Sequence, residues 1–138
     1  MHIALLGYGK MGKMIERIAV ERGHEVVLTV DENNRSTVTG EQLRQADVAV
    51  EFSAPAVAVD NYKWCFENGV PVVSGTTGWL ERWEEVVEDC RQRNGGFFYA
   101  SKFSIGVNIF FQLNKYLAKL MNGFDNYKVF IEETNHIH

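Results

Sequence analysis

The chain has 138 residues, of which 46% are hydrophobic, and its formal net charge is −4 at pH 7. This length suits one ordinary domain with a buried core, and a chain with only two prolines and no low-complexity tract is not a disordered one. The negative charge gives no reason to expect a nucleic-acid partner, and no apolar run approaches the roughly twenty residues of a membrane span.

The N-terminal residues predict a strand, a glycine turn, a helix and a second strand. An apolar strand over residues 3–6 leads into Gly-Tyr-Gly-Lys-Met-Gly at residues 7–12, which has the G-x-G-x-x-G spacing. Apolar residues at helical spacing predict a helix over 11–22, and residues 25–30 are expected to form the second strand. This order is typical of a βαβ unit that binds a dinucleotide.

Each residue of this pattern has an expected role in binding a dinucleotide. Gly7 permits a tight turn, Gly9 lets the backbone approach a pyrophosphate, and Gly12 lets the helix pack closely on the strand. The helix N-terminus offers unpaired N–H groups to the phosphates. Asp31, nineteen residues after Gly12, is placed to accept hydrogen bonds from the adenosine ribose. The alternatives are an ordinary glycine turn and a turn acid at a strand end.

Strand and helix patterns then alternate as far as residue 99. Strands are expected at 48–52, 70–73 and 97–99, with helices at 55–68 and 79–90 between them. Near-continuous apolar strands joined by helices predict a Rossmann-type doubly wound parallel sheet, covered on both faces, with ligands at the carboxyl ends of its strands. Trp79 and Trp83 recur at helical spacing and are interpreted as packing residues. Cys65 and Cys90 match no metal spacing and are expected to be packed thiols in a reducing cytosol.

The pattern changes near residue 105. A broadly apolar helix is predicted over 107–122 and a strand over 127–131. Such a helix should be buried against more chain or another subunit. We therefore expect a dinucleotide-binding domain at 1–105 and the beginning of a second α+β domain, for substrate binding and oligomerisation, at 106–138.

Three loops follow the later strands and should line the ligand site. They comprise residues 51–55, 74–78 and 100–106, and their small and hydroxyl-bearing residues suit contacts with a nicotinamide and its ribose. Taken singly, each could be a polar turn. The predicted cofactor-binding residues are Gly7, Tyr8, Gly9, Lys10, Met11, Gly12, Asp31, Phe52, Ser53, Gly75, Thr76, Thr77, Ala100, Ser101, Lys102 and Phe103.

Four segments in this order resemble the 4-hydroxy-tetrahydrodipicolinate reductase (dihydrodipicolinate reductase) family over the whole chain. They are the glycine loop at 7–12, Glu-Phe-Ser-Ala-Pro at 51–55, Gly-Thr-Thr-Gly at 75–78 and Phe-Ser-Ile-Gly-Val-Asn at 103–108. The resemblance implies hydride transfer from NADH or NADPH to a cyclic imine-type dicarboxylate in lysine and diaminopimelate synthesis. It also implies a Rossmann domain, a substrate domain with a mixed sheet, and a cytoplasmic homotetramer.

The chain departs from the family pattern at several positions. Its glycine loop takes the shorter form, and Lys102 stands where the family usually carries Asn. Asn135 occupies the position of the family's catalytic histidine, and His136 that of the second, substrate-contacting histidine. The family's proton-donating lysine would follow His138. Because hydride transfer needs a positioned acid, we expect the 138 residues alone to be inactive.

Other readings of the sequence stay open. One is a nucleotide-binding module without catalysis, and another is a different Rossmann amino-acid dehydrogenase. Asp31 and Glu32 place two acids where the 2′-phosphate of NADPH would lie, and Arg35 is near enough to offset them, so NADH should bind at least as well as NADPH. Two terminal histidines without a third ligand make a weak metal site, and none is expected.

Overall fold

The computed structural model describes residues 1–132 and 134. Its chain forms two compact units, Met1–Ser101 and Lys102–His138. In chain order the elements are β1 (His2–Leu6), α1 (Lys10–Glu21), β2 (Glu25–Val30), α2 (Gly40–Leu43), β3 (Val48–Glu51), α3 (Pro55–Glu67), β4 (Val72–Ser74), the 3₁₀ turn η1 (Leu80–Arg82), α4 (Trp83–Gln92), β5 (Phe97–Tyr99) and α5 (Ile105–Met121). The last of these belongs to the second unit.

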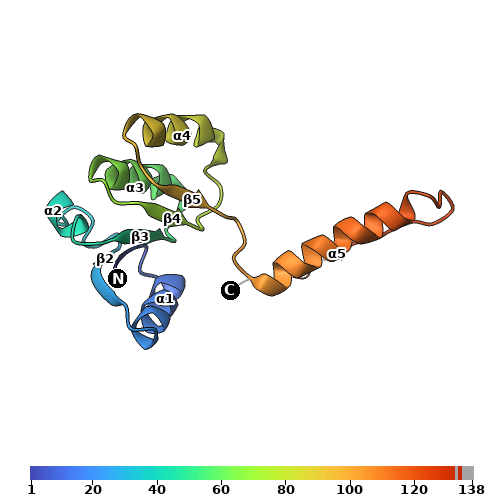
Figure 1. Cartoon of the computed structure of the whole chain (residues 1–138), viewed down its shortest axis with the longest axis horizontal. Coiled ribbons are helices and arrows are strands. Elements are labelled where there is room, and N and C mark those ends of the chain that lie inside the picture. Colours follow the sequence, from blue (N-terminus) through green and yellow to red (C-terminus); the bar gives the residue numbers. More distant parts are fainter. Residues whose placement is uncertain (133, 135–138) are drawn as a thin grey trace. The chain divides into compact units, whose positions relative to one another are not determined.

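The first unit is built on a five-stranded sheet in the order β2-β1-β3-β4-β5 (Figure 1). All four neighbouring strand pairs are parallel. The chain moves from β1 outward to β2 and then crosses back to β3 on the other side of β1, so the direction of winding reverses between β1 and β3. The predicted Rossmann-type doubly wound sheet is therefore confirmed, and ligands of such sheets bind at the carboxyl ends of the strands beside this reversal.

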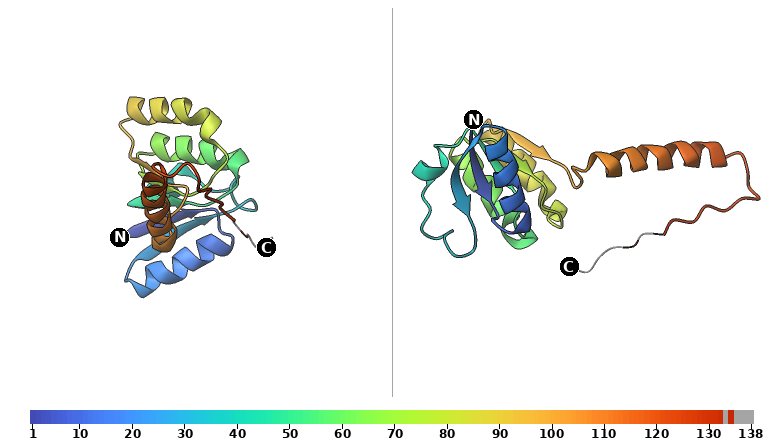
Figure 2. Two further views of the ribbon diagram at one scale, coloured as in Figure 1. Left: turned by 90° about the vertical axis from the view of Figure 1, so that its right-hand side faces the viewer. Right: turned by 90° about the horizontal axis from the view of Figure 1, so that it is seen from below.

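Alternation along β1 separates the core into two layers. Ala4 and Leu6 belong to the larger cluster with α2, α3 and α4, whereas Ile3 and Leu5 belong to a smaller cluster with α1. Figures 1 and 2 show the same arrangement, with α1 on one face of the sheet and α3 and α4 on the other. Cover on the α1 face is only partial, since the side chain of Phe98 on β5 is 58% exposed.

Aromatic residues fill the larger layer beneath α4. Trp79 is buried and packs edge-on against Tyr62, with ring centroids 4.9 Å apart, and it also contacts Trp83 and Phe97. The interpretation of Trp79 as a packing residue is confirmed, and Trp83 stacks on it while remaining 38% exposed. Both cysteines are free thiols, and burial raises the pKa of the buried Cys65 to about 12.

Several elements differ from the predicted ones. The helical run expected at 79–90 is divided into η1 and α4, and the short helix α2 was not predicted. Its N-terminus is held by a capping box, in which Thr39 and Gln42 exchange side-chain and backbone hydrogen bonds. In the second unit, the strand predicted at 127–131 is wrong, because those residues form neither helix nor strand. An apolar alternating segment becomes a strand only when a neighbouring strand pairs with it, and no strand of the described part of this unit does so.

Helix α5 begins two residues earlier than expected, because Ser104 caps it. The Ser104 side chain accepts a hydrogen bond of 3.4 Å from the backbone N–H of Val107. None of its residues, all of which the structure describes, is buried. The predicted broadly apolar helix is thus present with most of its apolar side chains exposed.

Candidate functional site

The three glycines of the first turn each meet a different steric demand. Gly7 has φ +98°, and a Cβ there would lie 2.1 Å from the carbonyl oxygen of Phe52. A Cβ on Gly12 would lie 2.3 Å from the carbonyl oxygen of Gly7, so this glycine allows α1 to pack against the turn. A Cβ on Gly9 would meet no protein atom within 4 Å. The space above the Gly9 backbone is therefore open to a ligand.

The N-terminus of α1 is suited to bind an anion. Among the residues that the structure describes, no side chain caps this helix, and its first turn carries no acidic residue. The backbone N–H groups of that turn and the positive end of the helix dipole therefore remain available. A phosphate placed over Gly9 would meet both.

Asp31 follows β2 and forms a tight turn. Its Oδ1 accepts hydrogen bonds from the backbone N–H groups of Asn33, at 2.8 Å, and Asn34, at 3.2 Å. The Asn34 side chain closes the turn by accepting from the Asp31 N–H and donating to the Thr29 carbonyl, both at 2.9 Å. The hydrogen bond from the Asn33 N–H lowers the pKa of Asp31. Its carboxylate therefore stays ionised well below neutral pH.

This lowered pKa predicts how nucleotide binding depends on pH. The ionised form of Asp31, which is the form able to accept hydrogen bonds from the hydroxyls of a ligand, persists as pH falls and is lost only below the ordinary range of an aspartate. We therefore expect the Kd for NADH, measured by calorimetry, to change by less than about twofold between pH 7.5 and pH 5.5. A steep weakening of NADH binding between pH 6.5 and pH 5.5 would contradict a role for the ionised Asp31 carboxylate in binding.

The larger of two neighbouring cavities in the first unit has a volume of about 730 Å³, which is in the range of ligand sites. It extends from the glycine turn to the end of β2 and the start of α3. Its lining comprises Gly7, Tyr8, Gly9, Val30, Asp31, Glu32, Asn33, Arg35, Phe52, Ser53, Ala54, Val57, Asp60 and Asn61. The Arg35 guanidinium lies over the Trp64 ring, 4.1 Å from its centroid, so this cation is held at the wall beside the acidic residues.

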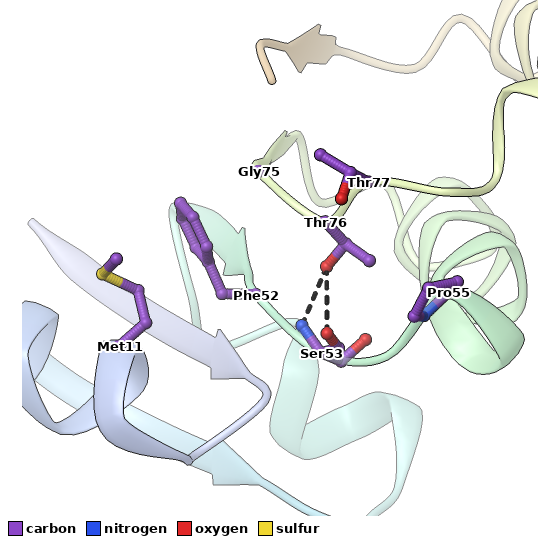
Figure 3. Close-up of a pocket in the computed structure, with 7 residues that line it drawn as sticks. All are labelled: Met11, Phe52, Ser53, Pro55, Gly75, Thr76 and Thr77. Atoms are coloured by element: carbon purple, nitrogen blue, oxygen red, sulfur yellow. Dashed lines mark hydrogen bonds between the residues drawn. The ribbon is translucent and has the colours of Figure 1, made fainter. Parts of the chain in front are cut away.

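A smaller cavity of about 280 Å³ continues the site toward the ends of β3 and β4. Figure 3 draws its lining residues, which are Met11, Phe52, Ser53, Pro55, Gly75, Thr76 and Thr77. Phe52 and Ser53 line both cavities. The Phe52 ring lies so close to Gly75 that a Cβ there would be 2.2 Å from the ring. Gly75 thus makes room for the aromatic ring that stands between the two cavities.

Hydrogen bonds join the two loops of the smaller cavity. The backbone N–H of Ser53 donates to the Thr76 hydroxyl at 2.9 Å, and that hydroxyl lies 3.5 Å from the Ser53 carbonyl (Figure 3). The Thr76 carbonyl in turn accepts from the indole N–H of the buried Trp79 at 2.8 Å. These contacts hold the loop after β3 at a fixed distance from the loop after β4.

The structure brings together most of the predicted cofactor-binding residues of the first unit. Ten of them line one or both cavities, namely Gly7, Tyr8, Gly9, Met11, Asp31, Phe52, Ser53, Gly75, Thr76 and Thr77. Gly12 is buried beside the turn, and Lys10 begins α1. Ala100 and Ser101 follow β5, where the Ala100 N–H donates to the Ser74 carbonyl at 3.2 Å. Lys102 and Phe103 belong to the second unit, and Asn135 and His136 lie outside the described residues.

Helix α3 contributes cavity residues that sequence reasoning missed. Val57, Asp60 and Asn61 line the larger cavity from the first turns of this helix. Their spacing of three and four residues places them on one helix face, which was a usable signal. Asn61 gave a further one, because a buried amide in an apolar helix needs a partner, and its side chain donates to the Ser53 hydroxyl at 3.3 Å.

Residues 1–132 and 134 lack two features that other kinds of protein carry. Within this part of the chain, no helix combines the length and the apolar character that a membrane span requires. The same residues contain no group of three or more His, Cys, Asp or Glu side chains placed to hold a metal ion.

Comparison with known proteins shows the family of this chain. A sequence model described as dihydrodipicolinate reductase, N-terminus, matches residues 1–103, which include the sheet and both cavities. The chain belongs to the dihydrodipicolinate reductase family. A 4-hydroxy-tetrahydrodipicolinate reductase of Christiangramia forsetii is 45% identical over 137 residues, which are 99% of this chain and 56% of that protein. One of Staphylococcus carnosus is 34% identical over 131 residues, 91% of this chain and 53% of that protein. The chain thus spans about half the length of these curated relatives.

Solved structures support the fold assignment. A hyperthermophilic archaeal homoserine dehydrogenase mutant in complex with NADPH matches with a TM-score of 0.55 and 18% identity, covering 71% of this chain and 43% of that one. A Gfo/Idh/MocA family oxidoreductase from Vibrio cholerae matches with a TM-score of 0.57 and 15% identity, covering 72% of this chain and 38% of that one. At such identities the likeness concerns the Rossmann-like fold alone.

Proposed function

We propose that this chain provides the cofactor-binding part of an NAD(P)H-dependent 4-hydroxy-tetrahydrodipicolinate reductase, which acts in lysine and diaminopimelate synthesis. The observation that carries the proposal is the coincidence of the family match with two neighbouring cavities at the carboxyl ends of β1 to β4, which share Phe52 and Ser53 and are together called the groove. The family match favours this reductase over a different Rossmann amino-acid dehydrogenase. It also favours an enzyme over a binding module without catalysis.

The groove suits a nicotinamide dinucleotide along its whole length. The open Gly9 backbone and the N-terminus of α1 would bind the pyrophosphate, and Oδ2 of the Asp31 carboxylate would accept from the adenosine ribose. The smaller cavity, with Ser53 and Thr76, would hold the nicotinamide and its ribose. When bound, the reduced cofactor supplies the hydride. Ala100, Ser101, Lys102 and Phe103 stay predicted contacts on the nicotinamide side.

The residues at the adenosine end of the groove favour an affinity for NADH that is at least as high as that for NADPH. Asp31 and Glu32 both line the larger cavity, so a 2′-phosphate would meet two carboxylates. Arg35 lines the same cavity and could offset part of this repulsion from its place over Trp64. We therefore propose that NADH binds at least as tightly, with NADPH also accepted.

The remaining parts of the proposal rest on the family resemblance. The substrate would be a cyclic imine-type dicarboxylate, with His136 among its contacts and Asn135 at the position of the catalytic histidine. The full-length protein would be a cytoplasmic homotetramer. The exposed apolar side chains of α5, such as Ile105 and Leu113, are compatible with a second domain that packs on them.

Turnover by the full-length gene product tests this function. We expect the oxidation of NADH to depend on the presence of 4-hydroxy-tetrahydrodipicolinate. The oxidation is measured as the loss of absorbance at the band of the reduced nicotinamide. The 138-residue chain alone should bind NADH without turnover. A full-length product that binds NADH but never oxidises it with this substrate would contradict the proposal and favour a non-catalytic binding module.

A further inference from the structure

A buried carboxylate lies beneath the smaller cavity. Glu51, the last residue of β3, is completely buried, and so is Ser74, the last residue of β4. These two residues are paired in the β3–β4 register. Neither lines either of the two cavities described above, so neither touches a ligand bound in them. A buried acid is retained only where its oxygens accept hydrogen bonds, and the partners of Glu51 show what it holds.

Both oxygens of Glu51 accept hydrogen bonds from the loops of the smaller cavity. Oε1 accepts from the Ser53 hydroxyl and, at 3.1 Å, from the Ser53 backbone N–H. Oε2 accepts from the Ser74 hydroxyl at 2.7 Å. One carboxylate thus ties the end of β3 to the end of β4.

The Ser74 hydroxyl transmits this constraint to Thr76. It lies 2.6 Å from the Tyr62 hydroxyl and accepts from the Thr76 backbone N–H at 3.3 Å. Since its only proton goes to Glu51, Tyr62 must donate to it, and burial raises the pKa of Tyr62 so that the phenol keeps its proton. The hydroxyl of Ser74 therefore makes all three of its hydrogen bonds.

We propose that Glu51 is a positioning residue for the nicotinamide side of the groove, which sets the places of Ser53 and Thr76 without touching the cofactor. The inference rests on the proposed function, because it presumes that the smaller cavity receives the nicotinamide. It extends that function by naming a buried residue that governs one half of the site.

A glutamine at this position cannot replace the carboxylate. If its amide nitrogen faced Ser74, three donors would compete for the two lone pairs of that hydroxyl, and the Thr76 N–H or Tyr62 would lose its acceptor. If the amide nitrogen faced Ser53, it would meet the backbone N–H and the hydroxyl that both donate there. Glu51→Gln therefore disturbs one of the two cavity loops in either orientation, although its volume is unchanged.

Calorimetry with two ligands tests the proposal on the 138-residue chain. ADP occupies only the adenosine side and the pyrophosphate position, whereas NADH also fills the nicotinamide side with its second ribose and its nicotinamide. For Glu51→Gln we expect the Kd of NADH to rise about fivefold or more and that of ADP to change by less than about twofold. Ser74→Ala removes the hydroxyl that links Glu51 to the Thr76 backbone and leaves Glu51 itself unchanged. It should give the same pattern. Glu84→Gln on the exposed surface of α4 is the charge-matched control and should change neither Kd.

The outcomes separate the two proposals. The role of Glu51 would be overturned if the variants lost affinity for both ligands equally. It would also be overturned if folded variants bound NADH as tightly as the unaltered chain does. If Glu51→Gln does not unfold cooperatively, Ser74→Ala alone decides. Failure of the unaltered chain to bind either ligand would overturn the proposed function itself. Equal affinity of the unaltered chain for both ligands would overturn the assignment of the smaller cavity, and the role of Glu51 with it.

Discussion

Gly7→Ala is expected to destabilise the first unit by about 3 kcal/mol or more. The φ of +98° at this position is strained for any residue with a Cβ, and that Cβ would lie 2.1 Å from the Phe52 carbonyl oxygen and 2.8 Å from the Ser53 nitrogen. Both of these are backbone atoms, which cannot swing aside. Relief would require β1 and the loop after β3 to separate, and this loop lines both cavities. The variant should therefore lose NADH binding together with stability.

Gly23→Ala is a matched control that separates the cost of a positive φ from the cost of the steric clash. Gly23 also has a positive φ, +76°, but a Cβ there would meet no atom within 4 Å. This variant should lose only about 1–2 kcal/mol, the cost of the left-handed conformation. Urea unfolding followed by tryptophan fluorescence measures both losses. Equal losses in the two variants would show that the approach of Phe52 to Gly7 is not as close as described.

Asp31→Asn is expected to weaken NADH binding about tenfold while leaving the fold intact. The asparagine can keep an oxygen in the place of Oδ1, which accepts from the N–H groups of Asn33 and Asn34, so the turn persists. Its amide nitrogen replaces the oxygen that would accept from the ribose hydroxyls. A charge-assisted hydrogen bond is thereby exchanged for a weaker neutral one, in which the ribose hydroxyl must turn to accept from the amide.

NADPH should respond differently from NADH in this variant, because removing a negative charge relieves the repulsion of the 2′-phosphate. We expect the NADH preference to shrink or reverse in competition titrations. Asp60→Asn removes the same charge from the same cavity without touching the turn, so it should leave NADH binding within about twofold of the unaltered chain. If Asp60→Asn weakened NADH binding as much as Asp31→Asn does, the effect would come from the overall negative charge of the cavity and not from a contact between Asp31 and the ribose.

The sequence predicted the first unit well because its signals are local. The spacing of Gly7, Gly9 and Gly12 between a strand and a helix follows from the steric needs of one turn, and these needs reappear in the structure. Helix α2 went undetected, since four residues carry no periodicity and its capping box is its main signal. The segment at 127–131 has a strand-like pattern, but a strand needs a hydrogen-bonded neighbour that the pattern does not supply.

The limits of sequence reasoning at the site have a similar cause. Glu51 was noted only as part of a loop, whereas its bond to Ser74 arises from the pairing of β3 with β4. The cavity face of α3 depends on how that helix packs over the sheet. Tertiary contacts of this kind connect residues more than twenty positions apart, and no local pattern indicates them.

The central claim is that the groove over the glycine turn binds a nicotinamide dinucleotide. Calorimetric titration of the purified 138-residue chain with NADH tests it most directly, after a cooperative unfolding transition has shown that the sample is folded. We predict saturable binding at one site per chain, displaced by ADP-ribose. A folded sample that binds neither NADH nor NADPH would contradict the account.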